Sequence, residues 1–301
     1  MSDTHQPHSP NGPPAILCAD DYAMTEGVSA AIEELAAAER LSATSVLVTS
    51  RHWPAHAARI VGLRDRIAIA LHLNLTLGEP AGPMPGLAPS GTFPSLGTVL
   101  RLALRRKLDA REIANEVSRQ LDRFELHLGH PPDIVDGHQH VHALPQIRDA
   151  VLETLASRFP SAKPLVRDPS DSPLAILTRG AAPVKALGLS ILTASFGSRA
   201  RTLGFPTNQG FSGVSSFDEH VPYEDELARF FRDPGKRHLI MCHPGFPDAE
   251  LARLDPVVQR RRAEFEALRD SLDLPERIAH LRREPDGRVT WMPWSTAHAP
   301  G

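Results

Sequence analysis

Short apolar runs alternate with amphipathic segments along much of the chain. Apolar or β-branched runs predict strands at residues 15–19, 43–49, 67–73 and 133–136. Between these runs, the spacing of apolar residues predicts helices at residues 30–38, 54–61 and 112–128. Strands that alternate with helices in this order predict parallel strands joined by crossover helices.

The alternation continues in the second half of the chain. The pattern predicts a helix, a strand, a helix and a strand, in that order, at residues 146–157, 165–166, 174–185 and 189–192. Residues 256–283 are strongly charged and predict an outer helix with its apolar face on Phe265, Leu268 and Leu272. The whole pattern predicts an α/β barrel, in which helices surround parallel strands.

Two segments interrupt this alternation. Residues 79–97 are rich in proline and glycine, and residues 196–217 contain four glycines and few regularly spaced apolar positions. Long connections in a barrel are usually functional loops, although some are surface ornament. Because the predicted order places both segments after strands, on the rim where barrel active sites are built, we expect substrate-binding loops.

Length and composition narrow the class of protein. The 301 residues, 41% of them hydrophobic, are ordinary for one α/β barrel. Residues 1–14 are polar and predict a disordered leader, which leaves 15–301 as a single domain. The net charge of −3 offers no basic field for nucleic acid or membrane, and no apolar run is long enough for a secretory signal or a membrane span. We therefore expect a cytoplasmic protein that binds neither.

Acidic residues and histidines lie at the ends of four predicted strands, those at 15–19, 67–73 and 133–136 and a further apolar run at 238–243. They are Asp20 and Asp21, His72, Asp136 with His138, His140 and His142 directly after it, and His243 before Pro244 and Gly245. An α/β barrel gathers the C-terminal ends of its strands at one face, where its active sites lie. One fold would therefore bring all four strand ends together.

These residue types suit a catalytic metal site. Imidazole is the commonest metal ligand, and residues two apart in an extended segment project to the same side, so all three histidines of 138–142 could face one cavity. One aspartate with two histidines suits zinc, cobalt or manganese, and magnesium less well, and leaves positions open for water. Of the adjacent Asp20 and Asp21, one can bind metal while the other acts as a base, because consecutive side chains point in different directions.

Each residue also has a purely structural interpretation. Asp20 and Asp21 can cap the following helix, His72 can be a buried core histidine, and His243 can shape a turn. The clustered histidines can be hydrogen-bonded loop residues. Packing alone does not explain why four strands end in such residues at one face, so their joint occurrence favours the metal site.

The same residues carry a family resemblance. The motifs ADDY (19–22), LHLNLT (71–76), DGHQHVHALP (136–145) and CHPG (242–245) are similar, in order and spacing, to those of the YdjC-like carbohydrate deacetylases. That family includes a chitooligosaccharide deacetylase type and a hopanoid-associated branch, and the resemblance covers roughly residues 16–278. It implies a (β/α) barrel of seven or eight strands, related to the polysaccharide deacetylases, with one divalent metal ion, zinc or magnesium.

The resemblance also implies roles for individual residues. By residue match, Asp21, His72 and His138 bind the metal, Asp20 is the general base and His243 is the general acid. The implied reaction is metal-assisted hydrolysis of an acetyl group on an amino sugar or oligosaccharide, which releases acetate.

Three further residues are expected near this centre. His140 and His142 either orient the ligands or touch the sugar, and Arg167 either contacts the substrate or orients the base. The expected partner is an acetylated sugar, and a homodimer is left open.

The chain also departs from the family pattern. Tyr22 and Ala23 replace a Phe-Gly pair that many members have, and the long loops do not match the chitooligosaccharide type closely. The alternatives are a metal-dependent hydrolase of another amide or ester, or a catalytically silent sugar-binding barrel. A silent barrel would be expected to lack a ligand, the base or the acid, and this sequence has all of them.

Overall fold

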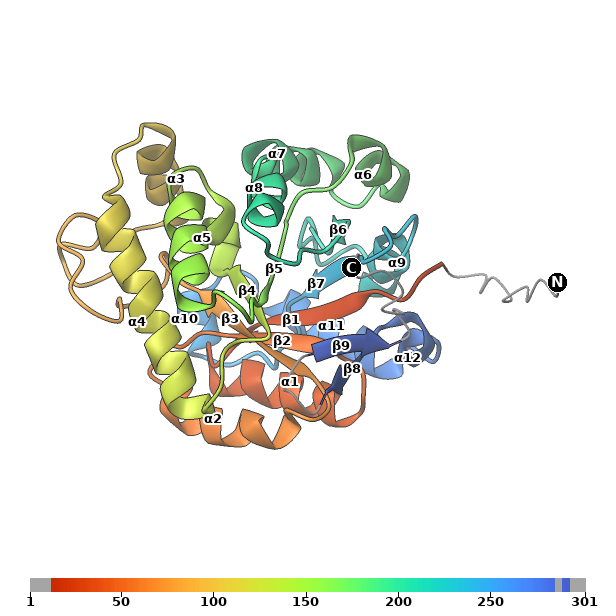
Figure 1. The fold of residues 1–301 in the computed structure, drawn as a ribbon. Helices are drawn as coiled ribbons and strands as arrows, with labels where there is room; N and C mark the ends of the chain where they lie inside the picture. The colour runs from red at the N-terminus through yellow and green to blue at the C-terminus, as the bar shows by residue number, and fades with distance from the viewer. Residues whose placement is uncertain (1–11, 285–288, 293–301) are drawn as a thin grey trace.

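Seven parallel strands form the centre of the protein. A computed structural model describes residues 12–284 and 289–292, so residues 1–11 of the predicted leader lie outside the described residues. The strand order in the sheet is β5-β4-β3-β2-β1-β7-β6 (Figure 1). The strands are β1 (Ile16–Tyr22), β2 (Ala43–Val46), β3 (Ala68–Leu73), β4 (Ile134–Gly137), β5 (Leu165–Val166), β6 (Phe211–Ser212) and β7 (Leu239–Cys242).

The sheet curls until its two edges meet. A parallel bridge pairs Val166 of β5 with Thr207, just before β6, and the Val166 N–H donates to the carbonyl oxygen of Pro206 at 2.9 Å. The Asn208 side chain adds two hydrogen bonds to the backbone of Asp168, of 2.7 and 2.8 Å. The fold is therefore a (β/α) barrel of seven parallel strands, as the sequence predicts.

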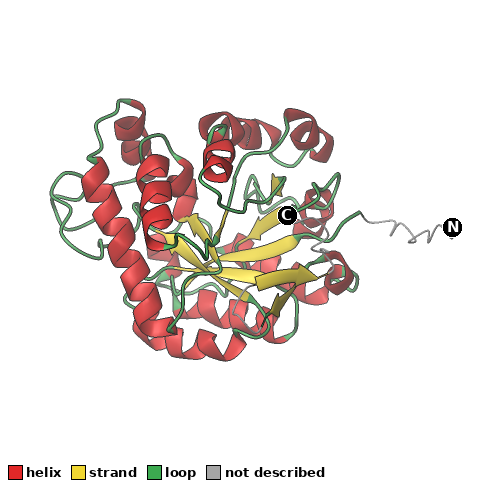
Figure 2. Ribbon diagram, viewed as in Figure 1, coloured by secondary structure: helices red, strands yellow, loops and turns green. Residues whose placement is uncertain are grey.

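Helices cover the outside of the curled sheet (Figure 2). α6, α7 and α8 lie at the top of the view in Figure 1, and α1 and α2 lie at the bottom. The helical elements are α1 (Glu26–Ala37), α2 (Trp53–Ile60), η1 (Val61–Leu63), α3 (Leu96–Leu104), α4 (Ala110–Leu128), η2 (His138–Ala143), α5 (Ile147–Arg158), α6 (Pro173–Arg179), α7 (Pro183–Thr193), α8 (Phe196–Thr202), α9 (Tyr223–Phe230), α10 (Leu251–Leu254), α11 (Gln259–Asp270) and α12 (Leu274–Arg277). An antiparallel pair, β8 (His280–Arg283) and β9 (Val289–Met292), follows.

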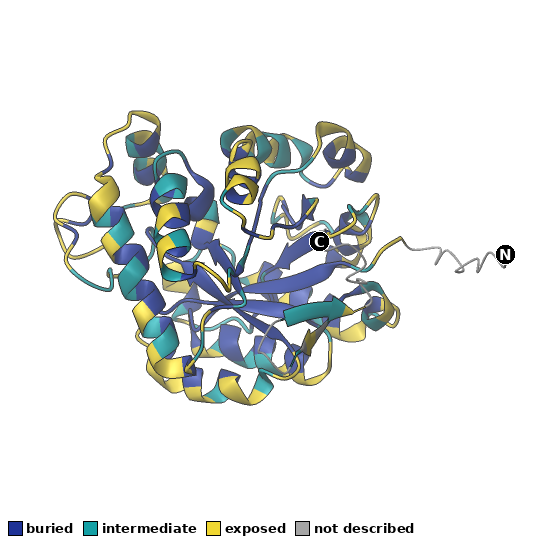
Figure 3. Cartoon of the chain, viewed as in Figure 1, coloured by how far each residue is buried: buried dark blue, intermediate teal, exposed yellow. Residues whose placement is uncertain are grey.

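Local sequence explains where the longest helix lies. The Asp109 side chain caps the N-terminus of α4 by accepting from the backbone of Arg111 at 2.8 Å, and Gly129 ends the helix in a left-handed conformation. The buried face of α4 includes Val117 and Phe124, which pack toward the sheet. All residues of β1 and β3 are buried as well (Figure 3), as expected for parallel strands covered on both faces.

The predicted strand at residues 189–192 is wrong. These residues form the last turns of α7, which begins at Pro183. A short apolar run fits either structure, and here the proline at the first helical turn starts a helix that continues through the run. The predicted helix at 174–185 is divided in two, because Gly180 ends α6 in a left-handed conformation.

Two other predictions change in detail. The segment 196–217, expected to be a loop, contains α8 and the sixth strand, β6. The charged helix predicted within 256–283 is divided into α11, α12 and β8, and Leu272 is 92% exposed because α11 ends at Asp270. No helix in the described part of the chain is long and apolar enough to cross a membrane.

A glycine in the connection after β6 is required by close backbone packing. Gly213 has a φ of 103°, and a Cβ there would lie 2.1 Å from the carbonyl oxygen of Met241. By contrast, Gly188 lies on the exposed side of α7, and a Cβ there would meet nothing within 4 Å.

These two glycines give opposite predictions for the same substitution. Gly213→Ala should lower the free energy of unfolding by more than about 1 kcal/mol, because the new methyl group collides with β7. Gly188→Ala should raise it by about 0.5–1 kcal/mol, because alanine favours the helix. Urea unfolding of both variants measures the difference. Equal stability of Gly213→Ala and the wild type would show that the two backbones are not in close contact.

Candidate metal centre and active site

The C-terminal ends of the strands bring the predicted site residues together. Asp20 and Asp21 end β1, and His72 near the end of β3 pairs in register with Asp136 of β4. His138 follows β4, Arg167 follows β5 and His243 follows β7. Since the strands are parallel, these residues all lie at one end of the barrel.

Asp21, His72 and His138 converge on one point. Oδ1 of Asp21 lies 2.9 Å from Nδ1 of His138 and 3.3 Å from Nε2 of His72. Each of the three buried residues offers a ligand atom, and these atoms lie within 4.8 Å of one another. This is the same set of three that the family resemblance implies.

The backbone of Asp21 separates the two adjacent aspartates. Its φ is 72°, and the pairing of β1 with β2 shifts register between Ala19 and Tyr22. Left-handed backbone is uncommon for aspartate, and here it interrupts the regular strand. As a result, Asp20 and Asp21 meet different partners.

A carboxylate orients His72. Its Nδ1 lies 2.7 Å from Oδ1 of Asp136, which leaves Nε2 facing Asp21. Metal-binding histidines are commonly fixed in this way by a carboxylate on the other ring nitrogen. Burial lowers the pKa of His72, but Asp136 and Asp20 outweigh burial and raise it to about 10. The centre therefore attracts positive charge.

The balance of buried charges also indicates that this centre attracts a cation. The three buried carboxylates of Asp20, Asp21 and Asp136 face only the two buried guanidinium groups of Arg167 and Arg261, and Arg261 also pairs with the carboxylate of Asp255. Negative charge is therefore in excess, and buried charge is stable only when it is compensated. A cation between Asp21, His72 and His138 fits both this excess charge and the ligand types present.

Arg261 of α11 holds the second oxygen of Asp21. Its Nη2 lies 2.7 Å from Oδ2 of Asp21 and 2.8 Å from Oδ2 of Asp255. Burial raises the pKa of Asp21, but His138 and Arg261 outweigh it and hold the pKa well below its usual range. Asp21 is therefore ionised, as a metal ligand must be.

Arg167 holds Asp20 from the opposite side. Its two Nη atoms bind the carboxylate of Asp20 at 2.7 and 2.6 Å, and Ser45 Oγ donates to the same group at 3.1 Å. Burial raises the pKa of Asp20, but Arg167 outweighs it and lowers the pKa below its usual range. Arg167 is fully buried and also pairs with Asp136. Of its two expected roles, this geometry favours orienting Asp20 over contacting a substrate.

In a second acidic cluster, the guanidinium group of Arg167 already provides the positive charge. Cys18, Asp20 and Asp136 also offer atoms close enough for an ion. However, Arg167 Nη2 contacts Cys18 Sγ at 3.1 Å and pairs with both carboxylates. The guanidinium group therefore occupies this position.

The three clustered histidines do not face one cavity. The segment is a turn of 3-10 helix rather than an extended strand, and two of its residues, Gln139 and His140, have left-handed backbone. His142 Nε2 donates to the backbone carbonyl of Arg167 at 2.8 Å, so His142 contacts the backbone of the arginine that holds Asp20. The prediction of a common direction for the histidines is therefore wrong.

His243 lies between an acidic residue and an aromatic ring. Its backbone N–H donates to Oε2 of Glu264 at 2.5 Å, and its ring packs edge-on against Phe217 with centroids 5.6 Å apart. Burial lowers the pKa of His243 to about 4, although Asp20 and Asp21 act in the other direction. The imidazole is neutral at neutral pH before any substrate enters.

The segment 196–217 contributes aromatic side chains to this face. Phe196 packs against His142, Phe211 against His140 and Phe217 against His243, with ring centroids 5.1, 5.7 and 5.6 Å apart. These contacts agree with the expectation that the segment lies at the rim. The segment 79–97 contributes Glu79 to a cavity of about 660 Å³, which Leu77, Trp53 and Leu126 also line.

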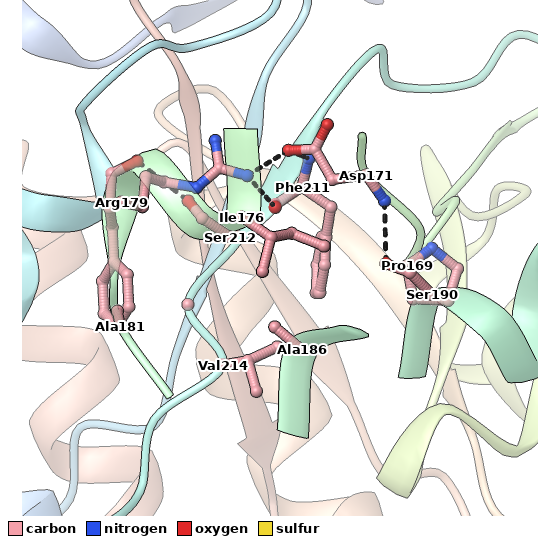
Figure 4. A pocket seen from close by; sticks show the side chains of 12 residues that line it. Pro169, Asp171, Ile176, Arg179, Ala181, Ala186, Ser190, Phe211, Ser212 and Val214 are labelled. Atoms are coloured by element: carbon pink, nitrogen blue, oxygen red, sulfur yellow. Dashed lines mark hydrogen bonds and ion pairs between the residues drawn. The ribbon is translucent and has the colours of Figure 1, made fainter. Parts of the chain in front are cut away.

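A small cavity near β6 does not suit a substrate. It measures about 20 Å³, which is room for about one water molecule. Figure 4 shows Arg179 beside it, hydrogen-bonded to Asp171 and to the backbone of Phe211. Arg179, Asp171 and Phe211 are therefore hydrogen-bonded to one another beside this cavity.

Sequence reasoning missed several residues of the site. Arg261 and Glu264 lie in a segment whose charges were expected to face solvent, yet both are 1% exposed. Phe217 and Asp255 were also not singled out. Nothing in the local pattern separates the buried charges of α11 from its exposed ones.

Comparison with known proteins identifies the family of this protein, which is a barrel with a candidate metal centre. The chain matches the sequence profile of the family described as YdjC-like protein over residues 14–272, and it belongs to that family.

Its relatives include carbohydrate deacetylases. The chain is 29% identical to the carbohydrate deacetylase of Mus musculus over 77% of this chain and 78% of the relative. It is 28% identical to the chitooligosaccharide deacetylase of Yersinia pestis (strain Pestoides F) over 78% and 83%. A crystal structure from Enterococcus faecalis V583, of a protein described as acting in cellobiose-phosphate cleavage, matches with a TM-score of 0.67 and 23% identity, over 87% of this chain and 92% of that one. This structure shows a shared fold.

The buried Glu264 predicts a pH effect on stability. Burial raises its pKa from 4.5 to about 7. The stability contributed by its proton is therefore full below about pH 4.5 and is lost as the pH rises through about 7. Glu264→Gln should become more stable relative to the wild type across this window. Urea midpoints at about pH 5 and pH 8 measure this, with Glu266→Gln at an exposed position of α11 as the control. A constant difference between Glu264→Gln and the wild type would contradict the prediction.

Proposed function

We propose that this protein is a metal-dependent deacetylase that hydrolyses the acetyl group of an acetylated carbohydrate and releases acetate. The substrate is an N-acetyl amino sugar or oligosaccharide. The observation that carries the proposal is the division of the two adjacent aspartates, Asp20 held by Arg167 and Asp21 facing two histidines. The names of the relatives support the same reaction.

Asp21, His72 and His138 are the residues that would hold the metal ion. When bound, such an ion polarises the acetyl carbonyl and lowers the pKa of water. Two imidazoles and one carboxylate suit zinc better than magnesium, which prefers oxygen ligands and keeps several waters. Zinc is therefore the first metal to test and magnesium the second.

Asp20 is the proposed proton acceptor. Arg167 and Ser45 fix its carboxylate, so its oxygens need not reorganise when a proton arrives. Its low pKa means that it is ionised at neutral pH and accepts a proton only from a strongly acidified water.

His243 is the proposed proton donor to the leaving amine. An amine leaves poorly unless it is protonated. The neutral imidazole would first take a proton from solvent, and the neighbouring Asp20 and Asp21 favour its charged form. Asp20 would return the proton that it accepts from water to solvent at the end of the reaction. The Glu264 contact holds the backbone of His243 in place while the proton passes.

The residues of the site also bear on the two alternatives, a silent sugar-binding barrel and a hydrolase of another amide or ester. Each ligand, base and acid that a deacetylase needs is present, which disfavours a silent sugar-binding barrel. Hydrolysis of another amide or ester uses the same groups and is tested by the substrate range. A cytoplasmic location and a homodimer remain predictions from the sequence.

The two aspartates should respond differently to the same substitution. Asp20→Asn keeps the size and one of the two oxygens that accept from Arg167 but removes the base, so metal content should stay and acetate release should fall by roughly two to four orders of magnitude. Asp21→Asn should lose metal, as should His72→Ala and His138→Ala. Elemental analysis with an acetate assay on N-acetylated and O-acetylated sugars measures both effects. Metal loss in Asp20→Asn equal to that in Asp21→Asn would show that the assigned roles are wrong.

The role of His243 predicts a dependence on the leaving group. His243→Ala should slow acetate release from an amide by roughly 10²–10⁴-fold. It should slow release from an activated ester far less, because an acidic alcohol leaves without protonation. Comparing an N-acetyl sugar with 4-nitrophenyl acetate tests this, and an equal loss on both substrates would refute the role of acid.

A further inference from the structure

Gln139 and His140 carry backbone strain beside the reaction centre. Their φ and ψ angles are 53° and 28°, and 60° and 22°, both left-handed. Left-handed backbone of this kind is unfavourable for any L-amino acid other than glycine. The strain persists because the chain is anchored on both sides of the pair, by His138 and by His142.

The side chain of His140 also has an unpaired polar atom. Its ring packs edge-on against Phe211 with centroids 5.7 Å apart, and the residue remains partly exposed. Nδ1 is buried but has no hydrogen-bond partner among the described residues. Burying a polar atom without a hydrogen-bond partner is unfavourable, because the atom loses its contact with water and gains nothing in return. Two unfavourable features therefore meet at one residue.

The turn that carries this imidazole lies beside the candidate metal centre. His138, two residues before His140, contacts Asp21, and His142, two residues after it, contacts the backbone carbonyl of Arg167. The ring therefore lies on the turn between a proposed metal ligand and the residue that contacts the arginine holding Asp20. An imidazole carries one N–H donor and one acceptor when neutral, so it can pair with a hydroxyl or an amide of a ligand.

We propose that His140 contacts the substrate, and that its unpaired nitrogen hydrogen-bonds a polar group of the acetylated sugar held between Asp20 and His243. The inference rests on the proposed deacetylase function and deepens it. Nδ1 of His142 also has no partner among the described residues, but His142 is fully buried and its Nε2 donates to the carbonyl of Arg167, whereas His140 is partly exposed. The left-handed turn then holds the imidazole in position before the sugar binds.

Substituting glycine at each of the two left-handed positions tests whether His140 has a role in activity or only a role in the backbone structure. Glycine adopts left-handed backbone freely, so neither His140→Gly nor Gln139→Gly should unfold at a lower temperature than the wild type. His140→Gly should lower kcat/KM for acetate release from N,N′-diacetylchitobiose at least about tenfold. Gln139→Gly, at an exposed side chain, should stay within about twofold. Zinc content should match the wild type in both variants.

Added imidazole gives a second readout. It should restore part of the activity of His140→Gly by filling the space of the missing ring, and it should leave Gln139→Gly unchanged. Native kcat/KM in His140→Gly would overturn the inference, and so would lower thermal stability with no rescue by imidazole. A wild-type protein that releases no acetate from any acetylated sugar would overturn the proposed function and this inference with it. The wild-type control therefore distinguishes the two failures.

Discussion

Two buried arginines that hold adjacent aspartates are the interaction on which the site depends. Arg167 comes from the end of β5 and Arg261 from α11, yet they bind consecutive residues of β1. Removing one partner of a buried ion pair typically costs 3–5 kcal/mol, because the other charge is left uncompensated. The two carboxylates therefore keep their separate orientations only while β1, β5 and α11 are all in place.

The barrel makes this arrangement rigid. The strands are short and buried, so the residues that follow them leave the sheet at fixed positions. His72 and Asp136 are paired in register on neighbouring strands, which sets their hydrogen bond without any loop. Local deviations from regular backbone occur where the chemistry lies, at Asp21, Gln139 and His140. Strain of this kind is stable only where the surrounding structure enforces it.

Much of the fold, and the residues that meet at the candidate metal centre, could be predicted from the sequence. Runs of β-branched and apolar residues marked β1 to β4, and polar residues at their ends marked the site. The apolar run at 189–192 misled the prediction, because periodicity does not separate a short strand from a buried or exposed helix turn. Arg261 and Glu264 could not be predicted, because their burial depends on how α11 packs against α1 and α9. The direction of His140 depends on a left-handed turn that histidine rarely adopts.

The excess of buried negative charge links the fold to the chemistry. The carboxylates of Asp20, Asp21, Asp136 and the partly buried Asp255 outnumber the two guanidinium groups that they contact, and a proton on His72 offsets part of this excess. A divalent ion held by Asp21, His72 and His138 would offset the excess and would supply fixed positive charge at its own position. Fixed positive charge in a buried site favours negative charge as it develops on a carbonyl oxygen. The arginines therefore hold the aspartates and also limit the negative charge that such an ion would have to compensate.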